Sequence, residues 1–180
     1  MKCLKTPING LMLFEPQIYK DNRGYFYESY NEKKITEFLG FTKQFVQDNF
    51  SYSKKGVIRG IHFQEKPYEQ AKLVSVLKGK VYDVAVDLRT ESETYLKWYG
   101  VILSSRNKRM LYVPEGFGHA FLVLSRDAKF IYKTSNFYSK DHEKCILWND
   151  NKININWPLN KYNIDHPIIS SKDLLGIKYE

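Results

Sequence analysis

The side chains of this sequence best suited to proton transfer near neutral pH are four histidines, His62, His119, His142 and His166. They form no His-x-x-x-His pair and no cluster with cysteine, so the usual spacings of zinc proteases and zinc fingers are absent. The chain also lacks Gly-x-Gly-x-x-Gly, P-loop and Gly-x-Ser-x-Gly motifs. The motif content therefore argues against dinucleotide-dependent, nucleotide-hydrolysing and serine-hydrolase chemistry.

His62 lies in the segment Val57–Gln64, which has the pattern of a strand. Two-residue periodicity would direct Ile58, His62 and Gln64 to one face of that strand. Inside a small β-barrel such a face meets either packed core or a ligand cavity. On this segment alone a structural histidine is the more common outcome.

Three further side chains leave similar alternatives open. His119 follows a proline- and glycine-rich turn, where it could contact a ligand or only stabilise the loop. Tyr132 shares a strand face with Phe130, a position that a core tyrosine often occupies. Asp173 lies three residues after Ser170 and could be a capping carboxylate. Local sequence by itself does not establish an active site.

Many short strands separated by turn residues must position these side chains. The clearest strand is Val81–Leu88, whose even-numbered residues Tyr82, Val84, Val86 and Leu88 share one face. The other expected strands are Leu11–Phe14, Gly24–Glu28, Val57–Gln64, Leu73–Leu77, Trp98–Leu103, Met110–Val113, Ala120–Leu124 and Lys129–Thr134.

Helix signals are few. Ser29 and Glu32 have the spacing of a capping box, an apolar stripe follows, and Gly40 is placed to end the helix. Ser170–Leu175 could form a short helical turn. So many strands with so little helix predict an all-β jelly roll or a similar closed double sheet.

Length and composition indicate one globular domain over residues 1–180, with no linker and no repeat. The formal net charge of +8 suggests an anionic partner, although a surplus of surface lysine explains it equally well. The lysines are scattered, so a phosphorylated small molecule fits better than nucleic acid.

The termini and cysteines bear on localisation. Cys3 and Cys145 are too few for a disulfide scaffold in a chain of 180 residues, and we expect reduced thiols in a cytoplasmic protein. Met1–Pro16 lacks the apolar core of a signal peptide, and no apolar run approaches the roughly 20 residues of a membrane helix. We therefore expect no membrane partner.

Several segments, taken in order, resemble the dTDP-4-dehydrorhamnose 3,5-epimerase family from about Ile8 to Asp173. Any one of them is weak, and their order and spacing carry the resemblance. The matching stretches are Asp21–Ser29 (DNRGYFYES), Phe45–Asn49 (FVQDN), Arg59–Gln64 (RGIHFQ), Lys72–Val74 (KLV), Val81–Arg89 (VYDVAVDLR), Val113–His119 (VPEGFGH), Trp148–Asp150 (WND) and Ser170–Asp173 (SSKD).

The resemblance implies a cupin-type jelly roll that works as a homodimer. Pro114-x-Gly116-x-x-His119 looks like the second cupin motif. The first metal-binding cupin motif would need His-x-His, whereas His62 is followed by Phe63 and Gln64. We therefore expect no metal and no cofactor, which agrees with the family's metal-free chemistry.

The resemblance also implies roles for individual residues. His62 corresponds to the catalytic base, oriented by Asp173, Tyr132 to the acid on the opposite sugar face, and Lys72 to the lysine near the ketone. Contacts with the pyrophosphate are implied for Arg23 and Arg59, and stacking on the thymine for Tyr138. A nucleotide pocket shared with the partner subunit is implied for Gln47, Asn49, Phe26 and Glu28. Further substrate contacts are implied for His119, Glu143 and Lys172. Asp83 is a further candidate beside the base.

This residue set suits epimerisation next to a ketone. A C4 ketone acidifies the protons on C3 and C5, and the enzyme needs a base, a donor for the enolate oxygen and an acid on the other ring face. The leading interpretation is therefore inversion of both carbons in dTDP-4-dehydro-6-deoxy-D-glucose, giving the keto sugar used for L-rhamnose.

Three alternatives remain open. The chain could invert only C3 or only C5, or accept another nucleotide-linked 4-keto sugar, including a heptose. It could be a non-catalytic cupin that binds a sugar nucleotide, or it could bind nucleic acid through its basic surface. Two departures from the family pattern, Lys140 in place of a common proline and Thr134-Ser135 in place of Cys-Thr or Ala-Thr, leave the nucleotide pocket and the exact sugar open.

Overall fold

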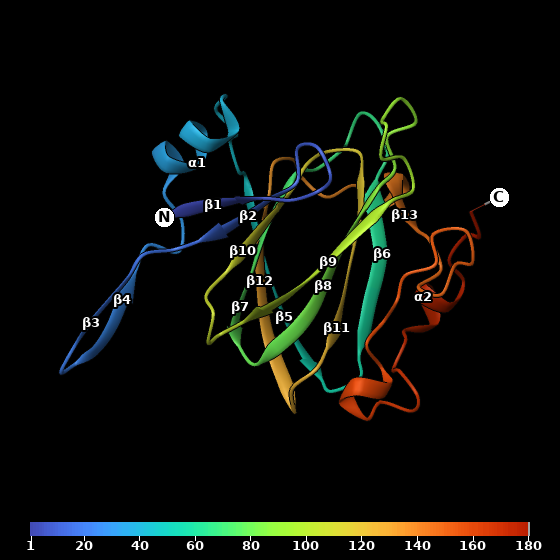
Figure 1. The fold of residues 1–180 in the computed structure, drawn as a ribbon. Helices are drawn as coiled ribbons and strands as arrows, with labels where there is room; N and C mark the ends of the chain where they lie inside the picture. The colour runs from blue at the N-terminus through green and yellow to red at the C-terminus, as the bar shows by residue number, and fades with distance from the viewer. Residues whose placement is uncertain (180) are drawn as a thin grey trace.

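Two antiparallel sheets face each other and form the body of the protein (Figure 1). The computed structural model describes residues 1–179. The six-stranded sheet has the order β1 (Lys2–Lys5), β2 (Met12–Glu15), β10 (Met110–Val113), β7 (Lys72–Lys78), β12 (Asp127–Thr134) and β5 (Gln47–Lys54). The five-stranded sheet has the order β13 (Glu143–Cys145), β6 (Ile58–Gln64), β11 (Phe117–Val123), β8 (Lys80–Asp87) and β9 (Trp98–Ser104). The prediction of an all-β double sheet is confirmed.

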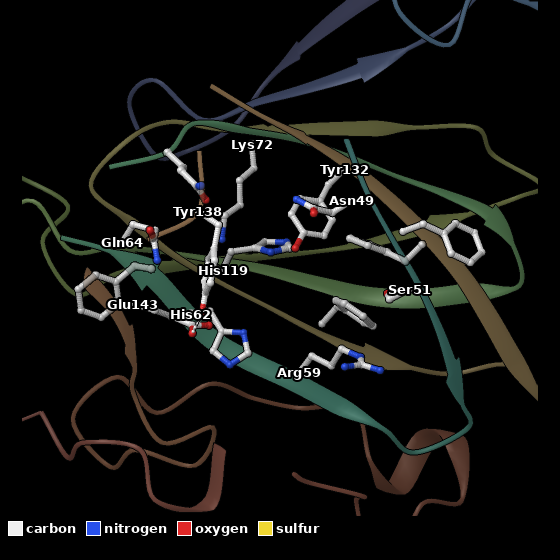
Figure 2. Close-up of a pocket in the computed structure, with 15 residues that line it drawn as sticks. Asn49, Ser51, Arg59, His62, Gln64, Lys72, His119, Tyr132, Tyr138 and Glu143 are labelled. Carbon is white, nitrogen blue, oxygen red and sulfur yellow. Dashed lines mark hydrogen bonds between the residues drawn. The ribbon is translucent and has the colours of Figure 1, made fainter. Parts of the chain in front are cut away.

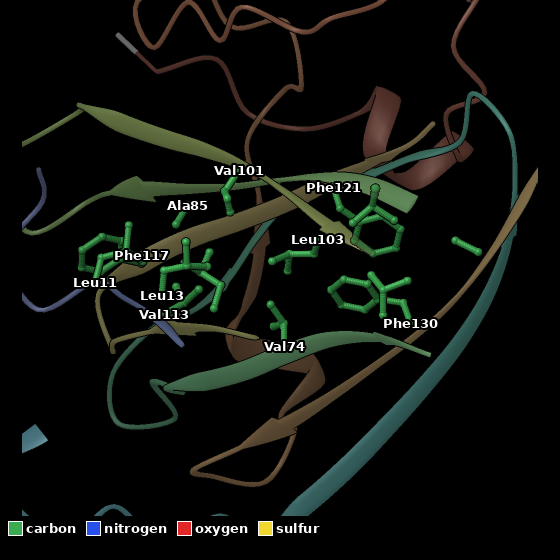
Figure 3. Packing of buried hydrophobic residues seen from close by; sticks show 14 of the residues in the cluster. Leu11, Leu13, Val74, Ala85, Val101, Leu103, Val113, Phe117, Phe121 and Phe130 are labelled. Atoms are coloured by element: carbon green, nitrogen blue, oxygen red, sulfur yellow. The ribbon is translucent and has the colours of Figure 1, made fainter. Parts of the chain in front are cut away.

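The main hydrophobic core fills the space between the sheets (Figure 3). Val74 and Phe130 come from the six-stranded sheet and meet Ala85 and Phe121 from the five-stranded one. The predicted alternation of β8 is confirmed, because Val81 and Ala85 enter this core while Val84 and Val86 lie in a second cluster on the opposite face.

Parts of the outer faces of both sheets are also covered. Helix α1 (Glu32–Leu39) inserts Ile35 among buried residues of the six-stranded sheet, including Phe14 and Leu73. The C-terminal segment packs Ile153 and Trp157 against the five-stranded sheet. It contains the short helical turns Lys140–His142 and Asn160–Tyr162 and the helix α2 (Ser171–Leu174). This double covering explains why strands such as β10 are buried on both faces.

The expected capping box of Ser29 and Glu32 is wrong, because the helix begins at Glu32 and its third residue is Lys34. Asn31, and not Ser29, is the N-cap, and its side chain accepts a hydrogen bond from the Lys34 amide. Asparagine caps a helix as well as serine does, and Asn31 stands directly before the first helical residue. Gly40 ends the helix with φ +79°, as expected. The expected turn near Ser170 is also present, as α2.

Four strands were not expected from the sequence: β1, β5, β13 and β3 (Ile18–Asp21). β3 pairs with β4 (Gly24–Tyr27) in a two-stranded hairpin that extends away from the body (Figure 1). All four carry many polar residues, so they lack the apolar alternation by which strands are recognised.

The cysteines, the helices and the C-terminal residue were also the subject of expectations. Cys3 and Cys145 are both free thiols, in agreement with the sequence analysis. None of the described helices is long and apolar enough to cross a membrane. The predicted domain of residues 1–180 includes Glu180, which lies outside the described residues.

Candidate active site

A polar cavity of about 360 Å³ opens between the two sheets (Figure 2). Eight of the side chains selected from the sequence line it together, although they come from six strands and a loop. They are Asn49, Arg59, His62, Lys72, His119, Tyr132, Tyr138 and Glu143.

An irregularity in β6 aims His62 into this cavity. The register between β6 and β11 shifts between the pairs His62–His119 and Arg59–Phe121. Arg59 and His62 therefore both line the cavity, while Ile58 packs on the opposite face of the sheet. The expectation that Ile58 shares a face with His62 is wrong, because the extra residue of a β-bulge interrupts strict alternation.

The carboxylate of Asp173 forms a hydrogen bond with the His62 ring and orients it. Nε2 of His62 lies 2.9 Å from Oδ1 of Asp173, and the Gly60 amide donates to Oδ2 at 3.3 Å. Ser170 caps α2 by accepting from the Asp173 amide, so the carboxylate is not a helix cap. The structure gives Nδ1 of His62 no hydrogen-bond partner among the described residues, which leaves that nitrogen to accept a proton.

The charge state of Asp173 follows from the same contacts. Desolvation raises the pKa of this carboxyl, but the hydrogen bond and charge of His62, with the bonds from Gly60 and Ser170, outweigh it and lower the pKa. Asp173 is therefore ionised near neutral pH. An ionised carboxylate fixes the imidazole tautomer and stabilises the imidazolium that forms when His62 takes a proton.

The facing wall carries Tyr132 and Lys72. Tyr132 lies on β12, between Asn49 of β5 and Val74 of β7. Burial, with a smaller contribution from the charge of Glu143, raises the pKa of Tyr132, so the phenol keeps its proton. Because β12 belongs to the six-stranded sheet and β6 to the five-stranded one, Tyr132 and His62 reach the cavity from opposite sheets.

Lys72 is buried at the start of β7, and burial lowers the pKa of its amine to about 8. The charges of Glu143 and Asp83 act in the opposite direction and hold the pKa from falling further. The amine is therefore cationic at neutral pH, and its burial reduces the screening of its charge by solvent.

A second histidine is also paired with a buried carboxylate. Nε2 of His119 lies 3.0 and 3.1 Å from the two oxygens of Asp83, which is fully buried. Asp83 was a candidate for a place beside the base, but the structure pairs it with His119 instead of His62. The pair fixes the His119 ring where it lines the cavity.

The remaining predicted residues on this side form a polar rim. Tyr138 donates to Glu143 at 2.7 Å, and Lys172 forms an ion pair with the same carboxylate. The Gln47 side-chain amide donates to Asn49 at 2.9 Å and accepts from the Tyr138 backbone amide at 3.4 Å. The bond to Glu143 raises the pKa of Tyr138, which keeps that phenol protonated.

Three predicted contact residues lie outside the cavity. Arg23 and Phe26 belong to the β3–β4 hairpin, where Arg23 pairs with Asp21 at 2.6 Å. Glu28 follows this hairpin and forms an ion pair with Lys34 of α1. Figure 1 shows the hairpin pointing away from the sheets, so this chain does not bring the three residues to its own cavity.

The cavity also contains residues that the sequence analysis did not select. Ser51 presents a buried hydroxyl without a hydrogen-bond partner among the described residues, and Gln64 exchanges two hydrogen bonds with the Ser139 backbone. Phe121 and Phe130 form the apolar end, stacked at 4.3 Å. The alternation Gln47, Asn49, Ser51 could have revealed Ser51 if β5 had been recognised as a strand.

Potential metal ligands gather at one point. His62, Cys145 and Asp173 bring a ring nitrogen, a sulfur and a carboxylate oxygen within 4.8 Å of one another. Asp173 contacts both of the others, since its Oδ1 lies 2.9 Å from Nε2 of His62 and 3.9 Å from Sγ of Cys145.

A family model and individual relatives of known name both point to one family. A family model described as dTDP-4-dehydrorhamnose 3,5-epimerase matches residues 5–179. A dTDP-4-dehydrorhamnose 3,5-epimerase of Shigella flexneri is 51% identical over 179 residues, covering 99% of this chain and 96% of the relative.

Solved structures agree with the sequence matches. The dTDP-6-deoxy-D-glucose-3,5-epimerase of Legionella pneumophila, crystallised with dTDP-4-keto-L-rhamnose, is 47% identical, with a TM-score of 0.92 over 97% of this chain and 90% of that one. A more distant neighbour is a 3′-monoepimerase of Streptomyces bikiniensis in complex with dTDP-quinovose, which is 31% identical with a TM-score of 0.89 over 96% of this chain and 85% of that one.

Proposed function

This chain belongs to the dTDP-4-dehydrorhamnose 3,5-epimerase family, and we propose that it inverts C3 and C5 of a dTDP-linked 4-keto-6-deoxy sugar. The observation that carries the assignment of roles is the placement of His62 and Tyr132 in one cavity, on facing sheets. Its fold is the cupin-type jelly roll of that family.

Proton removal is assigned to His62. The C4 ketone makes the neighbouring C–H bonds acidic because the carbanion delocalises onto the ketone oxygen. Nδ1 of His62 takes the proton, and the resulting imidazolium is stabilised by the ionised Asp173 at 2.9 Å from Nε2.

The enolate oxygen needs a positive group, and Lys72 is suited to that task. Its amine is cationic at neutral pH and lies in the same cavity as His62 and His119. A buried cation stabilises a developing negative charge far more strongly than a solvated one does.

Reprotonation from the opposite face completes the inversion and is assigned to Tyr132. The phenol keeps its proton because burial raises its pKa, and a carbanion is basic enough to take that proton. Inversion at one carbon leaves a proton on His62 and none on Tyr132, and exchange with water restores both groups before the second carbon reacts.

The nucleotide end of the substrate is assigned to Arg59, Asn49, Tyr138 and the surrounding rim. Arginine suits a pyrophosphate because its planar fork can form two parallel hydrogen bonds. We propose that Arg23, Phe26 and Glu28 reach this same pocket from a second copy of the chain, in a homodimer whose two hairpins are exchanged.

The proposed function can be tested by proton exchange in deuterated water. Wild-type protein should incorporate deuterium at both C3 and C5 of the dTDP-linked 4-keto sugar. His62→Ala should lose exchange at both carbons and retain dTDP binding, because the base is removed and the nucleotide pocket is not. Full exchange in this variant would contradict the assignment of the base.

Tyr132→Phe is the matched variant for the acid. It should retain exchange at the carbons while net inversion falls, since proton removal by His62 does not need the phenol. An equal loss of exchange and inversion would remove the support for Tyr132 as the acid.

A second candidate function is epimerisation at C3 alone, which the similarity to the Streptomyces bikiniensis 3′-monoepimerase favours. The same experiment separates the two functions, because deuterium would then be found at one carbon only. Binding of the sugar nucleotide without any exchange would instead indicate a non-catalytic binding protein.

A further inference from the structure

We propose that His62, Cys145 and Asp173 form an inhibitory binding site for thiophilic divalent cations such as Zn²⁺ and Cd²⁺. The site goes beyond the epimerase activity, since the cation would act against the reaction and not within it. Binding rests on these three side chains alone, whereas the inhibitory effect rests on the proposed role of His62 as base.

The backbone places the three ligand atoms together. Cys145 lies directly opposite His62 in the antiparallel pairing of β13 and β6, so their side chains leave the same face of the sheet. Glu143, two residues earlier on β13, lines the cavity on that face. Asp173 approaches from α2 and contacts both His62 and Cys145.

The distances are close to those of a metal site. Zinc binds nitrogen and oxygen at about 2.1 Å and sulfur at about 2.3 Å, so tetrahedral ligands stand about 3.4–3.6 Å apart. Here Oδ1 of Asp173 lies 2.9 Å from Nε2 of His62 and 3.9 Å from Sγ of Cys145. The three ligand atoms all lie within 4.8 Å of one another, so adjustments of about an ångström would admit the ion.

The donor set selects for soft cations. A thiolate, a carboxylate and a neutral imidazole together carry two negative charges, which match a dication. Thiolate ligands favour Zn²⁺ and Cd²⁺ over Mg²⁺ or Ca²⁺, which prefer sites made of oxygen atoms. The thiolate is the form that ligates a metal, so binding releases the thiol proton.

Binding of the cation would disable His62 as a base by changing which ring nitrogen carries the proton. Without metal, the Nε2 proton of His62 is shared with Asp173 and the Nδ1 lone pair can accept a substrate proton. A cation on Nε2 moves the ring proton to Nδ1, while the thiol proton leaves to water. The imidazole then has no lone pair left for catalysis, and Asp173 no longer stabilises an imidazolium.

The test compares two cysteine variants of the full chain. Each is titrated with Zn²⁺ in a non-chelating buffer, and inhibition is expressed relative to its own activity after chelation. We expect the inhibition constant of Cys145→Ser to rise about tenfold or more, because a hydroxyl is a poor ligand for these cations. Cys3→Ser, which removes the other thiol on β1, should leave the inhibition constant unchanged.

A spectroscopic measurement is independent of activity. Co²⁺ added to the wild-type protein and to Cys3→Ser should give thiolate-to-cobalt charge-transfer absorption with one equivalent bound, and Cys145→Ser should not. This result would stand even if the proposed epimerase function failed. Absence of the band in folded wild-type protein, or equal inhibition of Cys145→Ser and the wild type, would overturn the proposal.

Discussion

At the scale of single residues, burial shifts the pKa values of Lys72 and Tyr132 in opposite directions. Desolvation disfavours the charged form of each group, so the pKa of the lysine falls to about 8 while the pKa of the tyrosine rises. The same wall of the cavity therefore carries the Lys72 ammonium, whose pKa is within about one unit of neutral pH, and the Tyr132 phenol, which stays protonated. These are the states needed to stabilise an enolate and to donate a proton to it.

The state of Lys72 leads to a prediction for the pH dependence. A lysine loses its charge as the pH rises through its pKa, so the cationic form that the proposed role at the enolate requires disappears above about pH 8. We expect kcat/KM, which reports groups of the free enzyme, to fall about tenfold per pH unit above that point. The measurement is initial rates between pH 6 and 10, and a rate that keeps rising to pH 10 would contradict a cationic role.

The sequence could indicate these residues only in part. Periodicity correctly placed Phe130 and Tyr132 on one face, and both line the cavity. It could not decide whether His62 is structural or functional, because the deciding partner, Asp173, is 111 residues away and meets it only in the folded chain. The roles of these residues were implied by the resemblance to a family. That resemblance suggested a place for Asp83 beside the base, whereas the folded chain pairs Asp83 with His119.

At the scale of secondary structure, the bulge in β6 depends on Gly60. Its φ of +116° is a backbone conformation that other residues rarely adopt. A Cβ at this position would also lie 2.5 Å from the carbonyl oxygen of His119 and 2.6 Å from the Cβ of Ala120. Close contact between β6 and β11, and with it the aim of His62, therefore requires glycine.

Gly60→Ala should destabilise the protein by about 3 kcal/mol, the sum of backbone strain and overpacking, and should also lower kcat. Gly40→Ala is the matched control, because Gly40 has φ +79° but no atom near its missing Cβ, and it should cost about 1 kcal/mol. Urea unfolding of both variants measures the difference. Equal losses of stability would show that the contact with β11 does not matter.

Strands were predictable where their residues alternate between core and solvent, as in β8. β5 and β13 were missed because their inward side chains, such as Asn49 and Glu143, face a polar cavity and not a hydrophobic core. The strands that carry polar groups into a site are thus the ones that hydrophobic periodicity detects least well.

At the scale of the whole molecule, the β3–β4 hairpin leaves Arg23 far from the cavity that its proposed role requires. An exchanged dimer predicts complementation between inactive variants. Arg23→Glu and His62→Ala chains, mixed by co-refolding, should recover about a quarter of the wild-type sites, because half the dimers are mixed and each has one intact site. Activity of the mixture relative to each variant alone is the measurement.

The matched control replaces Arg23→Glu, which lies in the hairpin, with a variant of a residue that lines the cavity. Arg59→Glu mixed with His62→Ala should recover nothing, since both changes lie in the cavity of a single chain and no combination leaves an intact site. Recovery in both mixtures, or in neither, would count against exchange of the hairpins.

The pairing of His62 with Asp173 has a consequence for how this enzyme acquires activity. The two residues meet only after β6 has joined its sheet and the segment containing α2 has docked beside β6 and β13, where Ile168 pairs with Val57 and Ile177 with Ile146. Contacts between such distant parts of a chain form late and slowly. With the roles proposed for His62 and Asp173, an intermediate with well-formed sheets would still be inert, and the return of turnover during refolding would mark the arrival of the native state itself.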